Sequence, residues 1–174
     1  KKEIFSFWFE ETEPSQWFQQ SDSFDREISE RFFNDYEMGR DGVYDGWKTE
    51  PEGCLALCIL LDQFPRNMFR GSAKSEAGVA HGRPFSNAGT NAGFDASMND
   101  DEKQFLYMPF MHSEDITDQR LSLMLFARLG RALSFARDHY AMIAQFGRFP
   151  HRNDVLGRET SAAEARAIAQ GHAW

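Results

Sequence analysis

The sequence has 174 residues and a formal net charge of −8, from 19 Lys and Arg against 27 Asp and Glu. Hydrophobic residues make up 41% and aromatic residues 14%, which is enough for one domain with a sizeable core and excludes extensive disorder. The acidic balance argues against nucleic acid and against anionic membranes as partners.

The two cysteines, Cys54 and Cys58, lie four residues apart in the apolar stretch GCLALCILL. We expect two small buried thiols on one helix face, because a zinc site needs more ligands nearby. Two cysteines do not make a disulfide-rich protein, which fits a reducing cytoplasm. The opening KKEIFSFWFEE has too short an apolar core for a signal peptide, and no apolar run is long enough to span a bilayer.

Two helices are predicted in the first part of the chain. FDREISERFFNDYEMGR, residues 24–40, places Phe24, Ile28 and Phe32 at helical spacing. TEPEGCLALCILLDQF, residues 49–64, carries Pro51 early, where the missing N–H of proline costs little. Its residues 54–61 are apolar on every side, so we expect this helix to lie at the centre of the protein.

The stretch GSAKSEAGVAHGRPFSNAGTNAGFDASMN, residues 71–99, differs from the rest of the chain. It is rich in Gly, Ser, Asn and Ala and has little apolar periodicity. We therefore predict a long irregular segment here, with at most one weak helical turn. Long loops of this kind are uncommon in compact domains and often functional or mobile.

Helices are again predicted from residue 99 onward. Asn99 and Glu102 have the spacing of a capping box, and Ser113 is expected to cap the next helix with Glu114 and Asp115 in its first turn. RALSFARDHYAMIAQF, residues 131–146, is a further helix, and the spacing of Ser and Glu in TSAAEARAIAQGH predicts a last one. No segment alternates as a strand does, so we predict an all-α protein.

Two stretches resemble each other. LLDQFPRNMFRG, residues 60–71, and IAQFGRFPHRNDVLGR, residues 143–158, both run from apolar residues through Gln-Phe and a proline to Arg-Asn, and both reach a Gly next to an Arg. Similar exits from two helices are natural in a helical-repeat superhelix. Two copies do not establish a repeat period.

Three motifs of this chain, LLDQFPRNMFRG, FLYMPFMHSED and FGRFPHRNDVLGRETSAAE, resemble the bacterial domain-of-unknown-function 924 family, and FSFWF near the start fits it too. The resemblance covers most of the chain. It implies a single helical domain over residues 1–174, with antiparallel helix pairs stacked in a tetratricopeptide-like superhelical bundle, and it implies no settled activity. Family members usually carry a helix where this chain has the stretch at residues 71–99, so that stretch departs from the pattern.

Each of the three motifs ends an apolar helix with polar residues next to a proline. The candidate site residues, in chain order, are Asp62, Arg66, Asn67, His112, Glu114, Asp115, Arg148, His151, Arg152 and Asn153. If the three helices pack together, their ends converge, and acids meet arginines around two histidines. We expect Arg66 or Arg152 to form an ion pair with one of three carboxylates, those of Asp62, Glu114 and Asp115.

Three interpretations of this cluster stay open. Arginine–carboxylate pairs can simply tie helix ends together. Alternatively, the arginines can hold a carboxylate or phosphate in a polar pocket that binds a peptide or a small anionic ligand. The third interpretation is a cofactor-independent enzyme in which His112 or His151 works with a carboxylate such as Glu114. His112, Glu114 and His151 lack the helical spacing of a metal site, and NAGTNAG lacks the features of a phosphate loop, so we expect neither a metal nor a cofactor.

Overall fold

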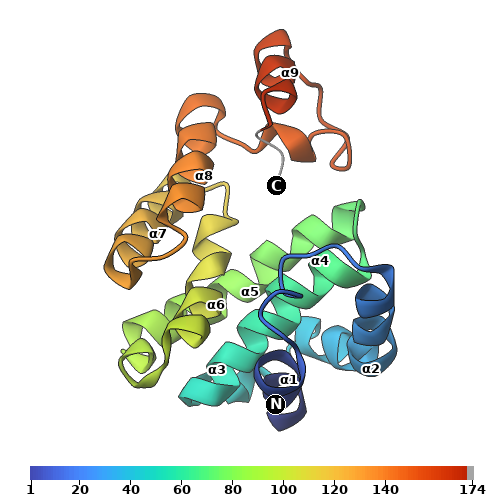
Figure 1. Ribbon diagram of the computed structural model, residues 1–174, viewed down its shortest axis with the longest axis vertical. Coiled ribbons are helices and arrows are strands. Elements are labelled where there is room, and N and C mark those ends of the chain that lie inside the picture. The colour runs from blue at the N-terminus through green and yellow to red at the C-terminus, as the bar shows by residue number, and fades with distance from the viewer. Residues whose placement is uncertain (172–174) are drawn as a thin grey trace.

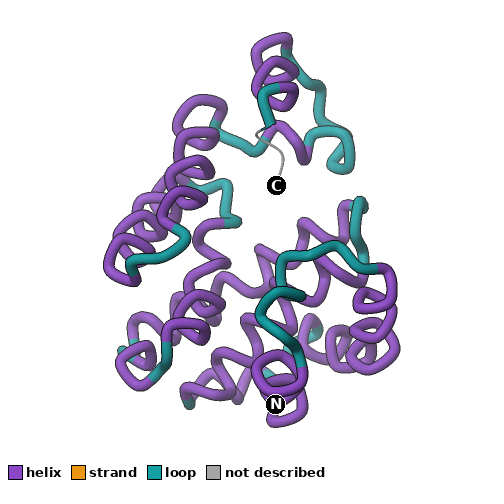
Figure 2. Tube along the Cα trace, in the orientation of Figure 1, coloured by secondary structure: helices purple, strands orange, loops and turns teal. Residues whose placement is uncertain are grey.

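The computed structural model describes residues 1–171, with every side chain except that of Val79. Within that range the chain forms helices, turns and loops and no strand (Figure 2), so the predicted all-α class is confirmed. The α-helices are α1 (Lys2–Ser6), α2 (Asp22–Arg40), α3 (Pro51–Cys58), α4 (Phe64–Met68), α5 (Ala73–Asn91), α6 (Asp100–Met111), α7 (Ile116–Leu129), α8 (Leu133–Phe146) and α9 (Ala162–Ala169). Short 3-10 turns lie at Asp45–Thr49, Phe94–Ser97 and Pro150–Arg152, and π-helical turns at Phe7–Glu11 and Ile59–Gln63.

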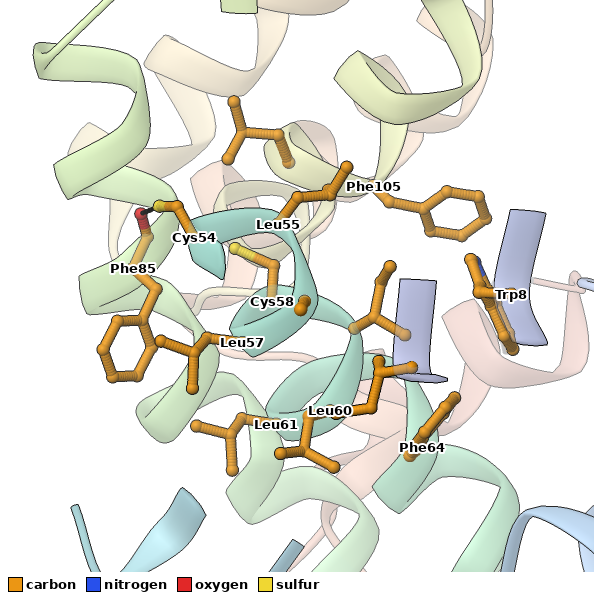
Figure 3. Close-up of a cluster of buried hydrophobic side chains, with 14 of the residues drawn as sticks. Trp8, Cys54, Leu55, Leu57, Cys58, Leu60, Leu61, Phe64, Phe85 and Phe105 are labelled. Carbon is orange, nitrogen blue, oxygen red and sulfur yellow. Dashed lines mark hydrogen bonds between the residues drawn. The ribbon is translucent and has the colours of Figure 1, made fainter. Parts of the chain in front are cut away.

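The centre of the protein is one continuous helical path made of α3, the π-helical turn Ile59–Gln63 and α4. Residues 54–61 are each at most 1% exposed, as their uniformly apolar character predicts. α1, α5 and α6 pack against α3, and α2 packs against α4. Figure 3 shows this core, in which the aromatic side chains of Trp8, Phe64 and Phe105 lie on one side of the central helix.

The predicted irregular segment at residues 71–99 is wrong, because α5 occupies most of it. Three glycines of α5, Gly78, Gly82 and Gly89, allow this helix to approach the central helix closely. A methyl group built on Gly82 would lie 2.9 Å from Cβ of Asp62, and one built on Gly89 would lie 2.9 Å from Sγ of Cys54. The thiol of Cys54 donates to the backbone carbonyl of Phe85 at 3.0 Å. Small residues thus form the packing face of this helix, and a search for large apolar side chains does not detect such a face.

The second half of the chain continues with α6, α7 and α8, each packed against the next (Figure 1). The capping box at Asn99 and Glu102 is present at the start of α6. The predicted cap of α7 is wrong by two residues, since Asp115 rather than Ser113 accepts hydrogen bonds from the first turn. α9 packs on the turn Pro150–Arg152, far from α1 to α3 in the view of Figure 1. No helix in residues 1–171 is both long enough and apolar enough to cross a membrane.

Candidate functional site: a cavity where helix ends meet

A partly enclosed cavity of about 650 Å³ lies where α4, the end of α6, the start of α8 and the turn Pro150–Arg152 come together. Its volume falls within the range of small-molecule sites, about 300–1,000 Å³. Part of its wall is polar, formed by Arg66, Glu76, His112, His139, His151 and Arg152. Another part is apolar, formed by Trp17, Phe18, Met108, Met111, Phe126 and Phe135.

Arg152 lines the cavity as a buried cation that the protein itself holds in place. Arg152 is only 4% exposed. Its Nη1 donates a hydrogen bond to the backbone carbonyl of His112 at 2.9 Å, and its guanidinium lies 4.4 Å from the ring centroid of Phe149. Nε lies 2.8 Å from Oε2 of Glu76, but the N–H is not aligned with that oxygen, so the contact is an ion pair without a hydrogen bond. Burial lowers the pKa of Arg152 to about 10, which leaves it charged at neutral pH.

Arg66 presents a different situation in the same cavity. It lies in α4, directly after Pro65, and its Nε and Nη2 are both buried. Neither nitrogen has a hydrogen-bond partner in the described part of the chain. Buried donors are almost always paired, so two unpaired N–H groups on one guanidinium require an explanation.

Asp62 and His112 form a buried carboxylate–imidazole pair, with His112 in the wall of the cavity and Asp62 behind it. Oδ2 of Asp62 lies 2.8 Å from Nδ1 of His112 and accepts a hydrogen bond of 2.6 Å from Gln63. Burial alone would raise the pKa of Asp62, but His112, Arg66 and Gln63 together outweigh it and lower that pKa. Burial, reinforced by Arg66, lowers the pKa of His112. The pair is therefore a carboxylate and a neutral imidazole with its proton on Nδ1.

The structure brings residues of all three motifs to one cavity, but the predicted ion pair is wrong. Arg152 pairs with Glu76 instead of an acid of the motifs, and Arg66 makes no ion pair with a described residue. Glu114 is occupied elsewhere, since it accepts from the backbone N–H of Phe149 at 2.7 Å and from Arg158 at 2.8 Å. Glu76 comes from α5, the helix that the sequence analysis missed.

Five of the predicted site residues do not line the cavity: Asp62, which lies behind His112, and four others. Glu114 ties the end of α6 to the segment after α8, and Asp115 is the exposed N-cap of α7. Arg148 bonds Glu164 at 2.7 Å and so holds the start of α9. The side-chain amide of Asn153 donates to Oγ1 of Thr160 at 3.3 Å. These contacts join helix ends to loops, which was the structural interpretation of the cluster.

Asn67 lines the cavity and also has a structural contact, because its amide donates to Asp25 of α2 at 2.8 Å. Glu76 and His139 are among the polar wall residues that were not predicted. His139 is 6% exposed on α8, and burial lowers its pKa to about 3. The glycines at 78, 82 and 89 are the sequence pattern that could have indicated α5, and with it the position of Glu76 on that helix. In residues 1–171 no three His, Cys, Asp or Glu side chains are grouped so that they could hold a metal ion.

Fold and site together define an all-helical protein with a partly enclosed, arginine-bearing cavity at converging helix ends. The family model described as "Bacterial protein of unknown function (DUF924)" matches residues 4–172, and the chain belongs to this family. A solved structure, "Structure of Protein of Unknown Function ATU0120 from Agrobacterium tumefaciens", is similar with a TM-score of 0.93 and 36% sequence identity, covering 97% of this chain and 96% of that one. No curated protein matches the chain.

Proposed function

We propose that the protein binds a small anionic ligand in this cavity and that Arg66 is its principal contact. The main support for this proposal is that two buried N–H groups of Arg66 have no hydrogen-bond partner in residues 1–171. A buried donor left unpaired costs about 1–3 kcal/mol, and a ligand oxygen at this position removes that cost. Guanidinium is suited to the role because its planar fork matches carboxylate and phosphate geometry.

A small molecule fits this site better than a long peptide does. The cavity has the volume of a small-molecule site and is bounded by residues of helices α4 to α8 and of the turn Pro150–Arg152, whereas a peptide of several residues needs an extended groove. A peptide could insert its terminal carboxylate here, and a tetratricopeptide-like stacking would provide a groove for the rest. That stacking and the cytoplasmic location both stay predictions.

The test is binding measured by calorimetry on the full chain and on Arg66→Met, with short-chain carboxylates and inorganic phosphate as probes. Methionine keeps an apolar stem and removes the fork. We expect a loss of at least about tenfold in affinity, with stability changed by no more than about 1 kcal/mol.

The matched control is Arg131→Met, which removes an exposed ion pair with Asp101 that lies outside the cavity wall. It should bind like the original protein. Equal affinity of Arg66→Met and the original chain would show that Arg66 is not the contact.

A second candidate function, a cofactor-independent enzyme, is supported by the Asp62–His112 pair. His112 lines the cavity, and its Nδ1 is engaged by a buried carboxylate, which leaves Nε2 for proton transfer. A carboxylate partner of this kind orients the imidazole and stabilises the imidazolium that forms during catalysis. Glu114 does not line the cavity, so Asp62 takes the role that the sequence analysis gave to Glu114.

This candidate is tested with activated esters that carry a carboxylate for Arg66. The original chain should hydrolyse them, and His112→Gln should lower kcat by about 10²-fold or more, as expected for loss of a general base, while carboxylate binding is retained. Hydrolysis that is unchanged in His112→Gln would exclude the histidine from the chemistry.

A further inference from the structure

We infer that the ligand is an amphipathic monocarboxylate: one carboxylate group on an apolar body. This inference rests on the anion binding proposed above. It adds the net charge of the ligand, the geometry of its head group and the apolar character of the rest of the ligand.

The geometry of Arg66 indicates the head group. Its two unpaired donors are Nε and Nη2, which lie on the same edge of the guanidinium, and their N–H bonds point in nearly the same direction. A carboxylate presents two oxygens to such an edge and forms two parallel hydrogen bonds. A single oxygen, as in an alcohol or amide, would leave one of the two N–H groups unpaired.

The charges around the cavity indicate a single negative charge. Arg66 and Arg152 are balanced by two carboxylates, Glu76 in the wall and Asp62 behind His112. Arg70 also lines the cavity, but its Nε and Nη2 donate to the carboxylate of Asp25, at 2.7 and 2.8 Å, and that carboxylate balances its charge.

The histidines add no positive charge at neutral pH. Burial lowers the pKa of His139 to about 3 and that of His151 to about 4, and it also lowers the pKa of His112. The site is thus close to neutral before the ligand enters. A dianion would leave two excess charges in a partly enclosed cavity and a monoanion only one, and because burial of uncompensated charge is costly, the monoanion is favoured.

The apolar wall indicates the body of the ligand. Met108 and Met111 of α6 and Phe126 of α7 line the cavity, and methionine adapts its shape to varied apolar partners. Phe18 and Phe135 also line it, and they are 61% and 54% exposed although they are large apolar side chains. An aliphatic or aromatic body would cover this surface and remove its apolar area from water, which favours binding.

The experiment compares probes on the full chain by calorimetry. 3-Phenylpropanoate and octanoate carry both features, 3-phenylpropanol lacks the charge, acetate lacks the body, and inorganic phosphate supplies a dianion without a body. We expect the better of the first two to bind at least about tenfold more tightly than each of the other three.

Each alternative result separates the two claims. Acetate or phosphate binding as tightly as the amphipathic carboxylates would overturn this inference and leave the anion site standing. The alcohol binding as tightly as its carboxylate would overturn both, because the arginines would then contribute nothing. Absence of binding by every probe would likewise overturn both.

A second variant tests whether the balance of charges around the cavity sets the preferred charge of the ligand. Glu76→Gln removes one of the two balancing carboxylates, so 3-phenylpropanoate should bind several-fold more tightly and phosphate should gain more than the monoanion does. Urea unfolding of the variant confirms that it is folded. Unchanged or weaker binding of both anions to the folded variant would show that Glu76 does not balance charge at the site.

Discussion

Arg152 and Arg66 line the same cavity but differ in how many contacts they make with the rest of the protein. Arg152 is 4% exposed and has three protein contacts, with His112, Glu76 and the ring of Phe149. Arg66 is less buried and leaves two N–H groups unpaired within the described chain. We therefore expect Arg152 to act mainly on stability and Arg66 mainly on binding.

The first prediction compares Arg152→Ala with Arg66→Ala by urea unfolding. Arg152→Ala should cost about 3 kcal/mol, because removal of one partner of a buried ion pair strands the other, here Glu76. Arg66→Ala should cost about 1 kcal/mol or less, since it breaks no protein hydrogen bond of its Nε or Nη2. Similar costs for both variants would contradict the division of roles.

At the scale of elements, α5 determines whether the cavity exists in this form. It carries Glu76 to the wall, and its glycine face brings it against the π-helical turn that holds Asp62. π-helical turns often occur at functional sites, and this one precedes Pro65, which cannot donate to the carbonyl of Leu61. A methyl group on Gly78 would lie 2.7 Å from that carbonyl oxygen.

The second prediction concerns that contact. Alanine has a helix propensity about 1 kcal/mol better than glycine, so Gly78→Ala would stabilise an exposed helix. Here we expect a net loss of roughly 1–3 kcal/mol, because a backbone atom cannot move aside as a flexible side chain can. Gly46→Ala is the control, since nothing lies within 4 Å of its added methyl group. A gain in stability for Gly78→Ala would mean that α5 sits farther from the central helix.

At the scale of the whole molecule, two histidines lie beside a small apolar cluster in the C-terminal part of the chain. Met142, Ile143, Phe149 and Ala167 form a small apolar cluster separate from the main core. His139 and His151 lie next to it, with their rings 5.3 and 5.7 Å from that of Phe149. Both histidines are neutral in the folded protein at neutral pH.

This arrangement predicts the pH dependence of stability. The folded pKa values of His139 and His151, about 3 and about 4, lie below the ordinary value of 6.5, so the unfolded chain binds more protons between those values. Their stabilising contribution is therefore fully present above pH 6.5 and is lost as the pH falls towards 4. Between pH 6.5 and 5.5 we expect a loss on the order of 1–2 kcal/mol, at most about 1 from each histidine.

Urea unfolding at pH 7.5, 6.5 and 5.5 measures the effect. His139→Gln should reduce the loss by at most about 1 kcal/mol, because the proton uptake of His139 is then removed from this window. A flat profile for the original chain between pH 6.5 and 5.5 would contradict the neutral state of the two histidines.

Local features were predicted from the sequence because their causes lie within a few residues. The all-α class follows from helical periodicity, the central position of residues 54–61 from their apolar character, and the capping boxes at Asn99 and Ser161 from spacings of three residues. The convergence of three polar motifs also follows from pattern, since apolar helices that pack together bring their ends near one another.

The pairing of charges was decided only by the tertiary structure. Arg152 reaches Glu76, Glu114 reaches Arg158 and Asp62 reaches His112, over separations of 44 or more residues. α5 was missed for a related reason: its small residues stabilise a helix only where another backbone comes close enough to fill the space that they leave. Such complementarity is a property of two surfaces in contact, so a pattern along one segment does not contain it.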